Sequence, residues 1–320
     1  MRKEQKYDVI IPTISRDFIR NRFNYYKICQ YLPAKKLVFI GPEDIYELVN
    51  EYKNNNKYYF GDIAKIEYVN ENDIVPYKQI QESLCSRIKR EGYTIPKEFN
   101  IGWYYQQFLK MSYSTICKDE YYISWDSDTI PLKKVKMFSE ENIPLFDIKR
   151  EYNPAYFRTM SKLFNGMGKI IEGSFISEHM IFSVEKMKVM IKKIEESDVF
   201  GKTYFDKIFS AISMDDIQIG FSEFETYGTF MMTLYPEEYQ LREWNSMRGA
   251  GYCFIPEELT QEDIDWLSKD FDALTFERYN PYYPEMAELF HNKEYRKIAS
   301  AGTIYQMLID KDVFARRELK

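Results

Sequence analysis

A buried strand that runs into two aspartates is the feature that most constrains how this chain folds. Residues 121–125 read YYISW, and Asp126, Ser127 and Asp128 follow directly. Such an aromatic and β-branched run predicts a buried strand. Because side chains alternate along a strand, Asp126 and Asp128 would point the same way if the extended backbone continued through Ser127. Two carboxylates at the carboxyl end of a buried strand suit Mn²⁺ or Mg²⁺, with water and phosphate oxygens as the remaining ligands.

The sequence before this strand alternates between strands and helices. Apolar runs at 7–11 and 36–40 predict buried strands, residues 65–69 predict a third short strand, and helical patterns at 17–31 and 42–53 separate them. This order predicts an α/β fold with a mostly parallel, Rossmann-related central sheet flanked by helices, followed by a helical C-terminal portion. Further helices are expected at 76–90, 101–117, 154–164, 184–196, 202–213 and 284–311, and further strands at 143–149, 174–183 and 271–276.

Composition and charge exclude several classes of protein. The net charge of −6 argues against a nucleic-acid partner. The four cysteines are far apart and form no C-x-x-C pair, which favours reduced thiols and a cytoplasmic location. We expect neither a signal peptide nor a transmembrane helix, because no apolar run approaches the roughly 20 residues of a membrane span. The two histidines exclude a histidine-rich zinc site, and no P-loop or dinucleotide-binding motif is present.

Several residues are candidates for contacts with a nucleotide. Thr13 and Asp17 follow the first strand, where ligands bind in open α/β sheets, although Asp17 is equally suited to capping the next helix. Trp103, Gln107 and Lys110 recur at helical spacings of four and three, so they share one face of a helix. That face either packs on the core or forms a polar cleft wall, in which Lys110 would contact a phosphate.

A general base is expected near residue 223. Ser222 and Glu225 fit the S-x-x-E pattern of a capping box at the start of a helix. Glu223 lies between them and is not needed for the box. A carboxylate at a helix N-terminus is stabilised as the anion, which suits a base that awaits an acceptor hydroxyl. Asp216 and its neighbour Asp215 are rival candidates, and each of these acids is alternatively a solvated surface group.

Later residues suggest a site for a second ligand. His179 interrupts an apolar run, where a histidine is either a satisfied core residue, part of an acceptor pocket or a metal ligand. Arg242, Trp244 and Arg248 form a basic and aromatic cluster. Aromatic rings stack on sugar faces and arginines pair with phosphates, whereas simple surface exposure is the alternative.

Five segments, taken together and in order, resemble a group of bacterial GT-A-type glycosyltransferases. These enzymes are often encoded with capsule or lipopolysaccharide genes, and many are known only as a domain of unknown function. The resemblance covers about residues 7–251 and rests on the combination, since no single segment is specific. The segments are residues 10–13 (IIPT), 102–110 (GWYYQQFLK), 125–129 (WDSDT), 179–180 (HM) and 222–228 (SEFETYG).

The resemblance implies a GT-A-like fold and the transfer of a sugar from a nucleotide-sugar donor, expected to be a UDP-sugar. The acceptor would be a hydroxyl of a glycan or lipid-linked glycan, reached in the cytoplasm or at the inner face of the membrane. Residues 1–130 would bind the nucleotide, 131–255 the acceptor, and 256–320 would form a helical extension of the single domain. The metal would lie at Asp126 and Asp128. Acceptor contacts are expected from His179, Glu225, Arg242 and Trp244.

Some alternatives stay open. In the wider GT-A class a late histidine often completes the metal site, but nothing around His291 resembles a ligand motif, so the third ligand is unassigned. We expect inversion at the anomeric carbon, and a retaining reaction would need no base at Glu223. A sugar-phosphate nucleotidyltransferase would normally carry a glycine-rich loop after the first strand, and residues 11–17 contain no glycine. A non-catalytic glycan-binding protein would leave the aspartates in a solvated turn.

Overall fold

The computed structural model describes residues 5–56, 64–93 and 99–310. The chain divides into two compact units. Both units are built from segments that are distant in sequence, so their boundaries differ from the expected division at 130 and 255. Unit 1 comprises Met1–Ile19, Pro33–Asp126 and Lys136–Glu243, and unit 2 comprises Arg20–Leu32, Ser127–Val135 and Trp244–Lys320.

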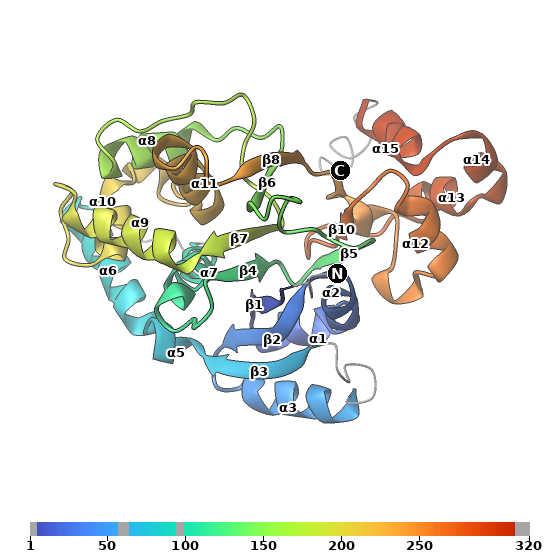
Figure 1. Cartoon of the computed structure of the whole chain (residues 1–320), viewed down its shortest axis with the longest axis horizontal. Coiled ribbons are helices and arrows are strands. Elements are labelled where there is room, and N and C mark those ends of the chain that lie inside the picture. Colours follow the sequence, from blue (N-terminus) through green and yellow to red (C-terminus); the bar gives the residue numbers. More distant parts are fainter. Residues whose placement is uncertain (1–4, 57–63, 94–98, 311–320) are drawn as a thin grey trace. The chain divides into compact units, whose positions relative to one another are not determined.

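A five-stranded sheet forms the centre of unit 1 (Figure 1). Its strands lie in the order β3 (Lys65–Asn70), β2 (Ala34–Gly41), β1 (Tyr7–Pro12), β4 (Tyr121–Trp125) and β7 (His179–Ser183). All neighbours are parallel except β4 and β7, which are antiparallel. The inner strand β1 is almost wholly buried and β3 at the edge is half-exposed, which explains why β1 is apolar apart from Asp8 and β3 is mixed. The predicted mostly parallel sheet is confirmed.

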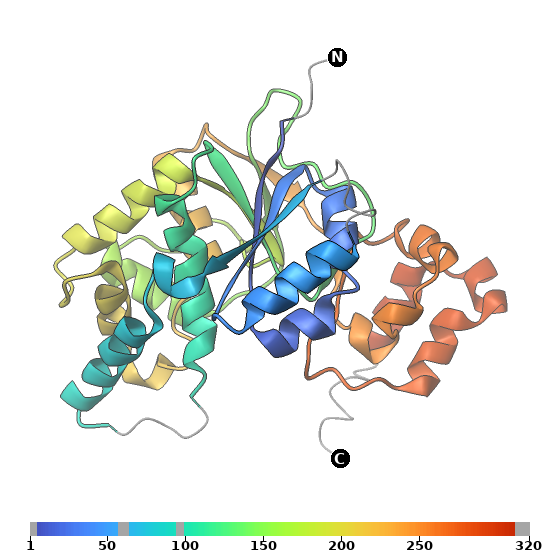
Figure 2. The same ribbon diagram turned by 90° about the horizontal axis from the view of Figure 1, so that it is seen from below.

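Helices flank this sheet, as Figures 1 and 2 show. The described helices that lie wholly in unit 1 are α3 (Ile45–Asn55), α5 (Glu71–Ile74), α6 (Tyr77–Arg90), α7 (Ile101–Ser112), α8 (Pro154–Leu163), α9 (Val184–Glu196), α10 (Tyr204–Ala211) and α11 (Glu223–Leu234). Helix α3 contacts β3, α7 contacts β1 and α9 contacts β7. Helix α11 packs on α7, α8 and α9. The fold is therefore of the predicted α/β class.

Capping side chains explain where several helices begin. Ser183 accepts a hydrogen bond from the Lys186 amide at the start of α9. Thr203 and Asp206 form a reciprocal capping box at the start of α10.

A two-stranded parallel sheet of β6 (Leu145–Ile148) and β8 (Gln240–Glu243) completes unit 1.

Unit 2 has its own small sheet and its own core. The sheet has the order β5 (Thr129–Pro131), β10 (Ala273–Thr275) and β9 (Ser246–Met247). Strand β10 runs antiparallel to β5 and parallel to β9. Its helices are α2 (Tyr25–Tyr31), α12 (Gln261–Leu267), α13 (Pro284–His291), α14 (Lys293–Ile298) and α15 (Ala301–Asp310), which confirms the helical C-terminal portion. The core includes Ile130, Leu132, Leu274 and Phe290.

The structure corrects three predicted elements. The helix expected at 17–31 is two helices, α1 (Ser15–Asn21) and α2, with a turn between them. The helix expected at 101–117 ends at Ser112 and continues as a short 3₁₀ turn, η1 (Tyr113–Thr115). The strand expected at 174–183 is limited to β7, because the residues before it make only one isolated bridge, between Lys149 and Ser174. Among the described helices, none is long and apolar enough to cross a membrane.

Candidate functional site

Strand β4 delivers Asp126 to the carboxyl end of the sheet. Trp125 is fully buried, whereas the Asp126 side chain is 35% exposed. The Asp126 amide donates to the carbonyl oxygen of Glu178 at 2.9 Å, which extends the β4–β7 pairing by one residue. A metal ligand at this position would thus rest on a rigid strand end.

The alternation argument for the two aspartates was wrong. The strand ends at Trp125, and Ser127 and Asp128 form a turn before β5. Side chains two residues apart point the same way only in extended backbone, so that rule does not apply across Ser127. Asp126 is the last residue of its segment of unit 1, and Asp128 belongs to unit 2. Whether the pair holds a metal stays a prediction.

Lys110 joins two of the predicted site residues. Its Nζ lies 3.0 Å from Oδ1 of Asp126 and 2.9 Å from Oε1 of Glu223. Lys110 and Glu223 are each 4% exposed, and the Phe224 ring covers the ammonium group at 4.3 Å. Burial lowers the pKa of Lys110, but the charges of Asp126 and Glu223 outweigh it, so the pKa is raised overall. The ammonium group is therefore permanently charged between two acids.

The start of α11 fixes the position of Glu223. The Glu223 amide donates to Oε1 of Gln107 at 3.0 Å, and Gln107 is 2% exposed. Gln107 and Lys110 thus face α11, so the shared face of Trp103, Gln107 and Lys110 is largely an interhelix contact. Trp103 is half-exposed at the end of this face.

The predicted capping box is half correct. Ser222 caps α11 by accepting from the Glu225 amide at 3.3 Å. The Glu225 side chain does not return to Ser222, because it accepts hydrogen bonds from Ser174 and from the Phe175 amide instead. Burial raises the pKa of Glu225, partly offset by the Ser174 hydroxyl. Glu225 is 2% exposed, and its predicted contact with an acceptor stays untested.

The remaining candidates lie at other places in the fold. Thr13 follows β1, where its amide donates to the Ile40 carbonyl oxygen at 2.8 Å. Asp17 is the third residue of α1 and therefore not its N-cap. Asp216 is bound by Arg158, at 2.7 Å, and by the Ser213 hydroxyl, at 2.6 Å.

The pKa of Asp216 reflects these bonds. Burial raises it, and the Ser213 and Arg158 hydrogen bonds outweigh burial, so the pKa is lowered overall. A carboxyl group held in this way is a weaker candidate for a base than the sequence suggested.

His179 belongs to a buried network of charges. Its Nε2 lies 3.0 Å from Oδ2 of Asp147 and 3.3 Å from Nη2 of Arg242. The Arg242 Nε donates to Oδ1 of Asp147 at 2.7 Å. The imidazole stacks on Trp125, with ring centroids 4.6 Å apart. His179 is thus a core residue beside the strand that ends at Asp126.

The predicted acceptor contacts of His179, Arg242 and Trp244 stay untested. What the structure shows is that His179 is 2% and Trp244 7% exposed. The Arg242 guanidinium group pairs with Asp147. Asp147, the partner of His179 and Arg242, was not singled out in the sequence analysis, because an isolated aspartate in a short strand carries no motif.

A family model decides the classification of the chain. It matches residues 5–290 and is described as a family of unknown function, DUF6492. The chain belongs to the DUF6492 family. Among curated proteins, none matches it.

Several solved structures are similar to this DUF6492 protein at low sequence identity. Mouse xyloside xylosyltransferase 1 in its apo form has a TM-score of 0.44 and 11% identity, over 88% of this chain and 100% of that one. The WbbM bifunctional glycosyltransferase has a TM-score of 0.48 and 12% identity, over 96% and 52%. GlyE of Streptococcus pneumoniae has a TM-score of 0.40 and 10% identity, over 97% and 64%. At these scores the likeness carries no argument about activity.

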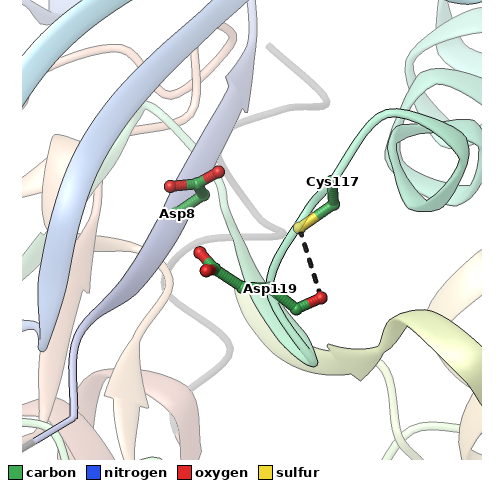
Figure 3. A group of neighbouring side chains, drawn as sticks. All are labelled: Asp8, Cys117 and Asp119. Atoms are coloured by element: carbon green, nitrogen blue, oxygen red, sulfur yellow. Dashed lines mark hydrogen bonds between the residues drawn. The ribbon is translucent and has the colours of Figure 1, made fainter.

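A second group of potential metal ligands occurs in the DUF6492 chain (Figure 3). In the part of the chain that the structure describes, Asp8, Cys117 and Asp119 each offer one ligand atom within 4.8 Å of the others. The Lys35 ammonium group already pairs with both carboxylates, and Tyr113 donates to Asp8 at 3.0 Å. Burial raises the pKa of the Cys117 thiol to about 11, so it is protonated at neutral pH. We interpret this group as an ion-paired cluster at the amino ends of β1 and β4.

The buried histidine of the DUF6492 chain gives a testable pH dependence. Burial, Arg242 and Lys149 hold the pKa of His179 well below 6.5. Below pH 6.5, His179 therefore stays neutral in the folded state but is protonated in the unfolded state. As a result, folding stability is lost as the pH falls. In His179→Gln this loss disappears. We expect the stability difference between wild type and variant to shrink by up to about 1.4 kcal/mol per pH unit below 6.5.

Urea unfolding at pH 7.5, 6.5 and 5.5 measures this difference. Asp147 has a pKa raised to about 6, chiefly by burial, and it gains a proton in the folded state as the pH falls. Protonation of Asp147 therefore raises folding stability as the pH falls, which is opposite to the effect of His179. Comparing the wild type with the variant removes the contribution of Asp147 that both proteins share. The exposed His291, changed to Gln, controls for the loss of a histidine. A difference that stays constant with pH would show that His179 titrates normally.

Proposed function

We propose that the chain is a metal-dependent glycosyltransferase. It would move a sugar from a nucleoside-diphosphate sugar, with UDP as the favoured nucleotide, to a hydroxyl of a bacterial surface glycan in the cytoplasm. The observation that carries this proposal is the Lys110 ammonium group held between Asp126 and Glu223. It brings an acid at the carboxyl end of β4 and an acid at the start of α11 to one point of unit 1.

The donor set fits Mn²⁺ or Mg²⁺. Asp126 and Asp128 offer hard oxygen ligands, and both side chains are partly exposed to solvent. These ions take few protein carboxylates and keep the other positions for water and phosphate oxygens. When bound, the ion would neutralise charge on the diphosphate leaving group. His179 is buried and bound to Asp147, so a site of oxygen ligands is what we propose.

Residues of unit 1 would hold the donor beside this point. Lys110 is the proposed phosphate contact, since its ammonium group can share its bonds with a phosphate oxygen near Asp126. Gln107 would act indirectly, by fixing the start of α11. The further proposed donor contacts are Thr13, Asp17 and Trp103, and the proposed acceptor contacts are His179, Glu225, Arg242 and Trp244.

Glu223 is the proposed general base of an inverting reaction. Its position at the start of α11 and its ion pair with Lys110 fix the place of the carboxylate, the group that would accept a proton. It would take the proton of the acceptor hydroxyl as that oxygen attacks the anomeric carbon. Asp216 is the weaker second candidate because Arg158 and Ser213 already occupy its carboxylate.

A screen of nucleotide sugars tests this proposal. We expect a UDP-sugar to raise the melting temperature only when Mn²⁺ is present, whereas GDP-, CMP- and dTDP-sugars should raise it less. Release of UDP in the presence of glycan acceptors then reports transfer. Release of diphosphate from a sugar phosphate and a nucleoside triphosphate would instead indicate a nucleotidyltransferase. Binding of a glycan without any effect of Mn²⁺ or nucleotide would indicate a non-catalytic protein and would contradict the proposal.

A further inference from the structure

Two buried asparagines hold the turn that carries Asp128 in unit 2. The Asn24 Nδ2 group donates to the carbonyl oxygens of Ser127, at 3.0 Å, and of Thr129. The Asn21 Nδ2 group donates to Oγ of Ser127 at 2.9 Å. Asn24 is fully buried and Asn21 is 2% exposed. Because Ser127 and Thr129 flank Asp128, the Asn24 amide group binds the backbone on both sides of it.

These asparagines do not serve their usual local roles. Asn24 is at the N-cap position of α2, where an asparagine side chain usually accepts from a helix amide, but it makes no such bond. The Oδ1 atoms of Asn21 and Asn24 are both buried and have no hydrogen-bond partner among the described residues. A buried acceptor left unpaired is costly. The two side chains are thus oriented so that their Nδ2 groups donate to the turn, although this leaves their Oδ1 atoms without a hydrogen bond.

The turn is also held by Phe276, the residue that follows β10. The Asp128 carbonyl oxygen accepts from the Phe276 amide at 2.9 Å. The Phe276 carbonyl oxygen in turn accepts from Arg20 Nη2 at 3.0 Å. The main chain of Asp128 is therefore bonded to Phe276, the residue after β10, while Asn24 binds the main chain of Ser127 and Thr129. Its carboxylate stays partly exposed on a fixed backbone.

We propose that Asn24, assisted by Asn21, is a positioning residue for the metal ligand Asp128. The amide group of Asn24 supplies two protons to two carbonyl oxygens, and no side chain of similar size supplies both. An aspartate at this position offers none and repels both oxygens. The inference rests on the proposed function, because it assigns Asn24 to the same metal site.

Mn²⁺ binding to the full-length protein tests this role without any reaction. Free Mn²⁺ is measured by electron paramagnetic resonance during titration, in the absence of nucleotide. Substituting a residue that positions a metal ligand typically weakens metal binding by about 10- to 100-fold. We expect Asn24→Asp to weaken Mn²⁺ binding by that factor. The control is Asn292→Ala, which removes a helix cap in the same unit. It should lower the melting temperature and leave the Mn²⁺ affinity unchanged.

The outcomes separate the two proposals. If the wild type does not bind Mn²⁺, the proposed function fails and the positioning role fails with it. If the wild type binds and Asn24→Asp binds equally well, only the positioning role is overturned. Should Asn24→Asp not fold, the variants Asn21→Ala, Ser127→Ala and their double mutant decide. Each single substitution should weaken Mn²⁺ binding. The double mutant should bind Mn²⁺ as well as either single mutant, because the two substitutions remove the same hydrogen bond, between Asn21 and Ser127. Unchanged affinity in all three would overturn the inference.

Discussion

Replacing Asp128 with alanine is expected to abolish the stabilisation that Mn²⁺ and UDP together give the wild-type protein. The substitution removes the carboxylate. The hydrogen bonds from Asn24 and Phe276 remain, because they are accepted by main-chain carbonyl oxygens of residues 127–129. The fold should therefore persist. If saturating ligand stabilises the wild type by about 2.7 to 4.1 kcal/mol, as expected for roughly 100- to 1,000-fold excess over its dissociation constant, the variant should show none of this.

Differential scanning fluorimetry with and without Mn²⁺ and UDP measures the effect. Asp265→Ala is the matched control, because Asp265 is an exposed aspartate of α12 in the same unit. It should respond to the ligands as the wild type does. Full stabilisation in Asp128→Ala would place the metal elsewhere and leave Asp128 as a residue of a solvated turn.

Replacing Lys110 with methionine is expected to cost roughly 3 to 5 kcal/mol of folding free energy, the range for removing one partner of a buried ion pair. The change leaves Glu223 buried without its ammonium partner and returns Asp126 to solvent. The hydrocarbon part of the side chain and its contact with Phe224 are conserved in volume by methionine. The loss is therefore mainly electrostatic.

Urea unfolding of a double-mutant cycle identifies the cause. Glu223→Gln combined with Lys110→Met removes both charges, so the double variant should be more stable than Lys110→Met alone. Lys192→Met is the control, since the Lys192 side chain is 74% exposed and its loss should change stability by less than about 0.5 kcal/mol. Additive effects of the two substitutions would show that the Lys110–Glu223 pair contributes no coupling.

Local sequence patterns were sufficient to predict most of the sheet and where some of the candidate residues lie in it. The apolar runs of β1, β2 and β4 are buried because they are inner strands, so their residues reveal both strand and burial. The helical spacing of Gln107 and Lys110 placed them correctly on one face of α7. Glu223 was found because Ser222 and Glu225 marked the start of α11.

Other features depend on contacts between residues far apart in sequence. The alternation rule misled at Asp128, because it assumes extended backbone, and the turn at Ser127 is held by Asn21 and Asn24 about a hundred residues earlier. No local pattern distinguishes those asparagines from ordinary helix caps. Glu223, the partner of Lys110 in α11, is likewise distant in sequence. The spacing of Gln107 and Lys110 therefore predicted a polar helix face without showing that Lys110 is buried against acids.

The division of unit 2 into three segments has a consequence for synthesis on the ribosome. Strand β5 pairs with β10, and Thr129 contacts Thr275, which lies 146 positions later in the sequence. Ile130 and Leu132 lie in a core that is otherwise built mostly from residues after 244. Their apolar side chains therefore stay uncovered until the segment after residue 244 has been made, and a chain that stops near 243 lacks the residues that cover them.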